Sequence, residues 1–78
     1  MDVRKTLLEV LADIGKPLAI DWPPDRPLEL ESLEVVLVHE QIETNFELRV
    51  PAREVTPEAF ATLHSLEALV ARLAKSQR

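Results

Sequence analysis

The chain contains no cysteine, so a disulfide framework and a thiolate metal site are both excluded. Aromatic residues are also scarce: Trp22, Phe46 and Phe60 occur without a single tyrosine. The two histidines, His39 and His64, are far apart and lack the spacing of metal ligands, so we expect no metal site. No set of nucleophile, base and acid can be named, and therefore no catalytic residue is predicted.

Positive charge and long hydrophobic runs are lacking as well. The 78 residues include 14 Asp or Glu and only 9 Lys or Arg, and the net charge is −5. A nucleic-acid partner is not expected, because it requires a basic face, and partners with basic docking patches are favoured. No apolar stretch has the form of a signal peptide or the length of a membrane span. We expect one domain over residues 1–78, free-standing, monomeric and cytoplasmic, with no membrane insertion.

The apolar spacing predicts helices near both ends of the chain. The first covers residues 2–14, with Asp2 as its N-cap and Gly15 as its C-terminal stop. The last covers residues 63–75. Each has an apolar stripe at helical spacing: Val3, Leu7, Val10, Leu11 and Ile14 in the first, and Leu63, Leu66, Val70 and Leu73 in the last.

A proline-rich loop is predicted over residues 15–31, since Pro17, Pro23, Pro24 and Pro27 interrupt any regular element. Its apolar residues should pin it to the core; they are Leu18, Ile20, Trp22, Leu28 and Leu30.

A second helix is predicted over residues 32–46, and it is apolar on two sides. One side is expected to face the core through Val35, Val38, Ile42 and Phe46. The other side is either covered by the preceding loop or open to a partner; it consists of Leu33, Val36 and Leu37.

The segment after this helix is predicted to be extended as far as Pro51, with Val50 in the core. A brief third helix should then begin at Pro57, with Thr56 as its N-cap and Phe60 as its anchor. These elements together give an all-α fold.

Ser32 lies in the run Leu28-Glu29-Leu30-Glu31-Ser32-Leu33-Glu34, where the loop gives way to the second helix. The unpaired N–H groups and the dipole at a helix N-terminus favour an anion, and such a place suits a covalently attached phosphodiester. Serine is also a common N-cap residue, so these seven residues alone leave both interpretations open.

Three phrases of the sequence, in order, resemble the acyl carrier protein family over nearly the whole chain. The first is Leu28 to Leu33, which is similar to the family's Asp-Ser-Leu signature. The second is Phe46 followed by Val50-Pro51, in register with Ser32. The third is Phe60-Ala61-Thr62-Leu63, which precedes a leucine-rich stripe. The resemblance implies a four-helix bundle with a long first loop and a short third helix.

By this resemblance Ser32 would carry 4′-phosphopantetheine, whose thiol holds an acyl group as a thioester for presentation to partner enzymes. Those partners would be a phosphopantetheinyl transferase and acyl-transfer or condensing enzymes of a specialised polyketide or lipid pathway. The residues expected to dock them are Glu31, Leu33, Glu34, Val36, Leu37, Glu40 and Glu43; any of the glutamates is equally well read as part of a solvated helix face. The residues expected to line an acyl-holding core are Val38, Ile42, Phe46, Leu63 and Leu66, all of which also suit plain packing.

The sequence departs from the family pattern beside the serine. Glu31 stands where the family has Asp, and Glu29 stands where it has Gly, a loss that restricts the loop if the position needs a positive φ. Two alternatives therefore stay open. One is an aminoacyl or peptidyl carrier, which the absence of paired glycines disfavours. The other is a helical adaptor that kept the fold and lost the modification.

Overall fold

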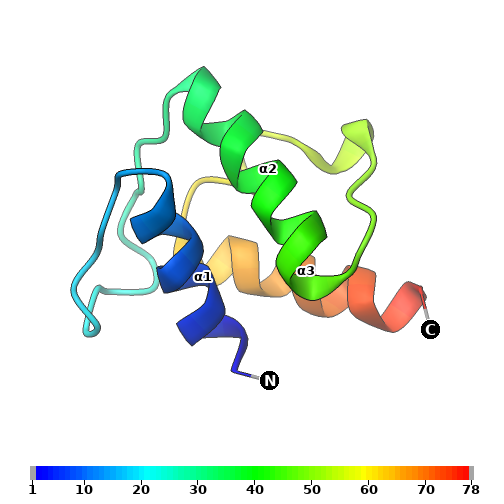
Figure 1. Cartoon of the computed structure of the whole chain (residues 1–78), viewed down its shortest axis with the longest axis horizontal. Coiled ribbons are helices and arrows are strands. Elements are labelled where there is room, and N and C mark those ends of the chain that lie inside the picture. The colour runs from blue at the N-terminus through cyan, green and yellow to red at the C-terminus, as the bar shows by residue number, and fades with distance from the viewer. Residues whose placement is uncertain (1, 78) are drawn as a thin grey trace.

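The computed structural model describes residues 2–77, and all regular structure within that range is helical. Three α-helices follow one another: α1 (Val3–Asp13), α2 (Ser32–Phe46) and α3 (Leu63–Ser76). A short 3₁₀ helix, η1 (Ala52–Glu54), lies between α2 and α3. Helix α1 packs against both longer helices, and the two long connections run along opposite sides of the molecule (Figure 1). The predicted all-α class is confirmed.

Helix α1 is one residue shorter at each end than the predicted range 2–14, and it has the predicted N-cap at Asp2 and the predicted stop at Gly15. The Asp2 carboxylate caps the first turn by accepting a backbone N–H three residues on, at 3.1 Å. Gly15 follows the helix with φ +88°, the left-handed region that glycine adopts without strain. Its N–H donates to Ala12 O at 3.1 Å, and the Lys16 N–H donates to Leu11 O at 2.9 Å. This pair of bonds is a Schellman motif, which fixes the backbone of Lys16 relative to α1.

Helix α3 begins with a reciprocal cap. Thr62 Oγ1 accepts the Ser65 N–H at 3.0 Å, and Ser65 Oγ accepts the Thr62 N–H at 3.1 Å. The predicted apolar stripe is confirmed, because every one of its members is buried together with Leu69.

The core is built from leucine, valine and isoleucine, with Phe60 as its one aromatic member among the described residues. All three α-helices contribute, and Leu28 and Val50 enter from the connections. The buried set is Leu7, Val10, Leu11, Leu28, Val38, Ile42, Val50, Phe60, Leu63, Leu66, Leu69, Val70 and Leu73.

The connection between α1 and α2 is held against the body of the protein, as predicted. The Leu28 N–H donates to Ala61 O at 2.8 Å, and Pro24 O accepts the His64 N–H at 3.0 Å. Leu28 is only 2% exposed. Ile20 departs from the expectation, because it is 84% exposed at the outer part of the connection.

The predicted third helix is not present as a helix, and a four-helix bundle is therefore not confirmed within residues 2–77. Thr56 does act as a cap, since its Oγ1 accepts the Ala59 N–H at 3.1 Å. The Phe60 N–H then closes one turn on Thr56 O at 3.2 Å. The chain has no room for a second turn, because Thr62 already caps α3. The segment forms turns here, and the short helix η1 lies earlier, where Glu54 forms a bidentate ion pair with Arg72 of α3 at 2.8 and 3.1 Å.

Phe46 faces the core as predicted, but it is only partly buried. It is the last residue of α2, and its side chain is half-buried against the core. The chain leaves the helix directly after it through Glu47, which has φ +53°. An end position leaves one side of the ring without a neighbouring turn, which explains the partial exposure.

Candidate functional site

Ser32 is the first residue of α2, and its side chain is exposed. Glu31, not Ser32, holds the N-cap position, so reading the serine as a simple N-cap is wrong. No hydrogen bond of the Ser32 hydroxyl is found among residues 2–77, and the hydroxyl is accessible from solvent. The hydroxyl lies at the N-terminal end of α2, where the first N–H groups of a helix have no carbonyl partners within the helix.

The segment just before Ser32, which we call the elbow (residues 28–31), has irregular backbone. Leu28 is anchored in the core, whereas Glu29 has φ +55° and an exposed side chain. A left-handed conformation is strained for any residue with a Cβ atom. Glu29 stands where the sequence pattern described above has glycine. Its φ is positive, so this position does have the backbone conformation that glycine favours.

Two charged side chains hold the elbow from the outside. Glu34 Oε1 accepts the Glu31 N–H at 2.8 Å. Lys16 Nζ donates to Glu29 O at 3.0 Å and lies 3.6 Å from Glu34 Oε1. Lys16 and Glu34 are both about one-quarter exposed, at 28% and 23%, so the pair is partly shielded from water.

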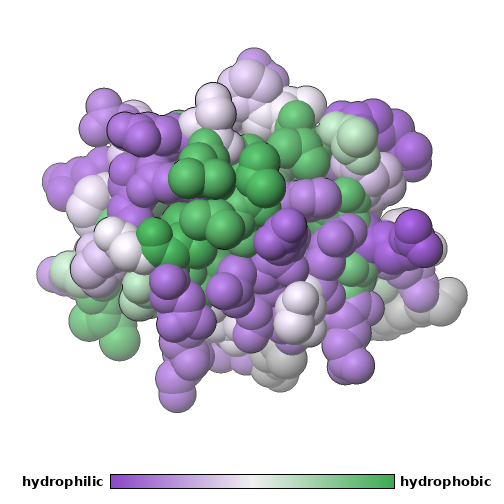
Figure 2. Space-filling view, turned by 45° about the horizontal axis from the view of Figure 1, so that its top comes forward, coloured by the Kyte–Doolittle hydropathy of each residue, from purple (hydrophilic) through white to green (hydrophobic). Residues whose placement is uncertain are grey.

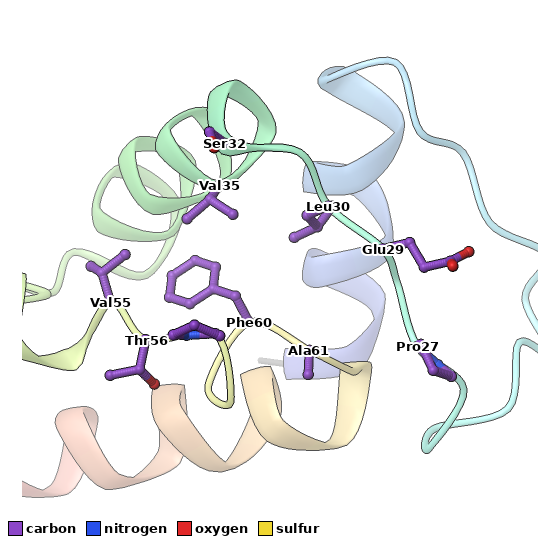
Figure 3. Close-up of a pocket in the computed structure, with 10 residues that line it drawn as sticks. Pro27, Glu29, Leu30, Ser32, Val35, Val55, Thr56, Phe60 and Ala61 are labelled. Carbon is purple, nitrogen blue, oxygen red and sulfur yellow. The ribbon is translucent and has the colours of Figure 1, made fainter.

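An open hollow of about 530 Å³ lies beside Ser32. Figure 3 shows Ser32 at the start of α2 on the rim, with Val35, Leu30 and Phe60 directed into the space below it. Val55 and Thr56 close the far side. The full lining is Pro27, Glu29, Leu30, Ser32, Val35, Val55, Thr56, Pro57, Phe60 and Ala61. The volume falls within the range of small-molecule sites, and the lining is mostly apolar.

The outer side of α2 carries an exposed apolar strip, defined by Leu33 and Val36. These side chains are 69% and 51% exposed. Figure 2 shows an apolar area bordered by hydrophilic residues on the side from which α2 begins. The preceding loop therefore does not cover this side of the helix. Leu37 is different: it is half-buried and borders a shallow depression with Glu40, Gln41 and Thr44.

The four glutamates expected to dock partners divide into two pairs. Glu31 and Glu40 are exposed. Glu34 is engaged in the elbow, and Glu43 Oε2 accepts the Val50 N–H at 2.8 Å. Glu43 also lies 3.7 Å from His39 Nε2, which is 2.7 Å from Val50 O. Glu34 and Glu43 thus have structural partners within the chain. The exposed Glu31 side chain also takes part in the capping box of α2, where it accepts the Glu34 N–H, and Glu40 lies exposed on the surface.

The five residues that were expected to line an acyl-holding core do not line the hollow. Val38, Ile42, Leu63 and Leu66 are fully buried in the core, and Phe46 is half-buried. None of them lines the hollow, whose apolar walls are Leu30, Val35, Val55 and Phe60. Sequence reasoning placed Leu30 and Phe60 in the core but did not connect them with Ser32. The available signal was local, since Leu30 and Val35 flank the serine by two and three residues.

Further features of the described residues limit the kinds of site. No group of three His, Asp or Glu within residues 2–77 could hold a metal ion. No helix in that range is both long and apolar enough to cross a membrane. Comparison with protein-family models, with curated proteins and with solved structures gives no match.

Proposed function

We propose that this protein is an acyl carrier protein that takes 4′-phosphopantetheine on Ser32 and presents the attached acyl group to partner enzymes. The observation that carries the proposal is the placement of one exposed, unbonded serine hydroxyl on the rim of an apolar hollow. The three sequence phrases that resemble the family add support. The polyketide or lipid pathway remains the proposed context.

The residues around Ser32 fit such a group. The hydroxyl is free to form a phosphodiester, and the N–H groups and dipole of α2 favour the resulting negative charge. The hollow offers apolar walls to an acyl group held on the phosphopantetheine thiol. When attached, the group supplies the thiol that this cysteine-free chain lacks.

The proposed docking surface is narrower than the sequence analysis implied. It combines the apolar strip of Leu33 and Val36 with the exposed carboxylates of Glu31 and Glu40. A small apolar surface flanked by carboxylates suits partner enzymes that carry basic, partly apolar patches. The transferase and the acyl-transfer or condensing enzymes would use this surface in turn.

Incubation with coenzyme A and a promiscuous phosphopantetheinyl transferase tests the proposal. The intact protein should gain the mass of one phosphopantetheinyl group, and Ser32→Ala should gain none. Ser76→Ala, which changes another exposed serine at the end of α3, is the matched control and should be modified like the parent. A parent that stays unmodified with several transferases would favour the unmodified adaptor instead.

A further inference from the structure

Lys16 joins the end of α1 to the elbow before Ser32. Its backbone is fixed by the Schellman motif that ends α1, because its N–H donates to Leu11 O at 2.9 Å. From this fixed point the side chain reaches Glu29 O at 3.0 Å and approaches Glu34 Oε1 to 3.6 Å. Within residues 2–77, no other Lys or Arg forms an ion pair with a residue of the elbow or the first turn of α2.

These contacts lie on both sides of Ser32. Glu29 comes before the serine and has a strained φ of +55°. Glu34 comes after it, and the oxygen near Lys16 is the one that accepts the Glu31 N–H at 2.8 Å. A single ammonium group therefore holds the strained residue before Ser32 and the capping residue after it.

The elbow also concentrates like charges. Glu29, Glu31 and Glu34 place three carboxylates within six residues, and a phosphodiester on Ser32 would add a fourth negative group. Repulsion among these negative groups disfavours holding them close together in this segment. Lys16 supplies the opposing charge, beside Glu29 O and the Glu34 carboxylate.

We propose that Lys16 is a positioning residue for Ser32. It keeps the elbow in its left-handed conformation and thereby holds the serine hydroxyl at the rim of the hollow, where a transferase can reach it. The proposal rests on the proposed function insofar as it concerns modification. The conformational part concerns residues 29–34 alone and can be measured without any transferase.

The test measures kcat/KM of a promiscuous phosphopantetheinyl transferase on Lys16→Met, with coenzyme A as donor. We expect a loss of about fivefold or more, because small displacements of a reacting group lower rates steeply. Lys16→Arg keeps the charge and should recover most of the rate. Lys5→Met removes an exposed lysine of α1 that forms no ion pair among residues 2–77, and it should react like the parent.

A second substitution separates positioning from general destabilisation. Glu29→Gly removes the backbone strain, so Lys16→Met should cost clearly less in that background than alone. An equal loss in both backgrounds, or no loss from Lys16→Met in the parent, would overturn the proposal.

The Cα and Cβ chemical shifts of residue 29 report its left-handed conformation directly. They should move toward extended values in Lys16→Met while the far-ultraviolet circular dichroism stays unchanged. If the parent accepts no phosphopantetheine, the proposed function fails, and these shifts alone decide the role of Lys16: unchanged shifts overturn it, and changed shifts support it.

Discussion

At the scale of single residues, the chain places glutamate at two positions where the backbone favours glycine. Glu29 in the elbow has φ +55°, and Glu47 at the end of α2 has φ +53°. Neither conformation arises from a local preference of glutamate. Each is imposed by its surroundings: Leu28 anchors one side of the elbow in the core, and the Leu48 N–H after Glu47 donates to Glu43 O at 3.2 Å.

Glycine at either position should stabilise the protein. Relief of the left-handed strain exceeds the entropy that glycine loses on folding, so Glu29→Gly and Glu47→Gly should each raise the free energy of unfolding by up to about 1 kcal/mol. Urea denaturation followed by circular dichroism measures the change. Glu29→Ala removes the same charge but keeps the strain, and it should show no such gain. Equal stability of the glycine and alanine variants would contradict the strain argument.

At the scale of the element, α2 presents a different environment on each side. Val38 and Ile42 face the core, Val35 faces the hollow, and Leu33 and Val36 face solvent. This division explains why the helix looks apolar on two sides in the sequence. One apolar side forms the core contact, and the other is free for a partner.

Leu33 should matter for docking and not for folding. Because it is 69% exposed, Leu33→Ala should change the free energy of unfolding by less than about 0.5 kcal/mol. It should raise the KM of the phosphopantetheinyl transferase, since the strip is adjacent to Ser32. Ile20→Ala is the matched control: this residue is 84% exposed but lies on the α1–α2 connection, so its KM should equal that of the parent. If KM rises equally in Leu33→Ala and Ile20→Ala, or rises in neither, the apolar strip is not part of the docking surface.

At the scale of the whole molecule, stability depends on a small aliphatic core shared by all three α-helices. Leu66 is fully buried within it, and Leu66→Ala should lower the free energy of unfolding by about 3 kcal/mol. Phe46→Ala should cost less, because the Phe46 side chain is only partly buried at the end of α2. Thermal and urea unfolding would rank the two. A larger loss of unfolding free energy for Phe46→Ala than for Leu66→Ala would contradict this ranking.

The sequence predicted most of the fold because its signals were local. Asp2, Gly15 and the apolar spacing located α1, and α2 begins and ends where predicted. The prediction of a third helix was wrong because it rested on Thr56 and Pro57 alone. Thr62 already caps α3, so too few residues remain between Pro57 and Thr62 for a further helix. Phe46 packs against the core as predicted, but its partial exposure was not foreseen, because periodicity assigns a residue to a face of the helix and not to a depth.

The candidate site was only partly predictable. Ser32 was identified from its local run, but the hollow depends on Val55 and Phe60, which are distant in sequence and meet the serine only in the folded chain. The contacts of Glu34 with Lys16 and of Glu43 with Val50 could not be predicted from the sequence either, because they form only when the chain is folded.

The hydrogen bond from Leu28 N–H to Ala61 O has a consequence for synthesis on the ribosome. The elbow begins at Leu28, yet its partner is made much later, and Pro24 likewise waits for His64. A nascent chain that ends before these residues can form α1 and α2 locally, but it cannot close the elbow or the hollow. We therefore expect the elbow and the hollow to take their final form only after the start of α3 has left the ribosome, so that any modification of Ser32 would follow translation of His64.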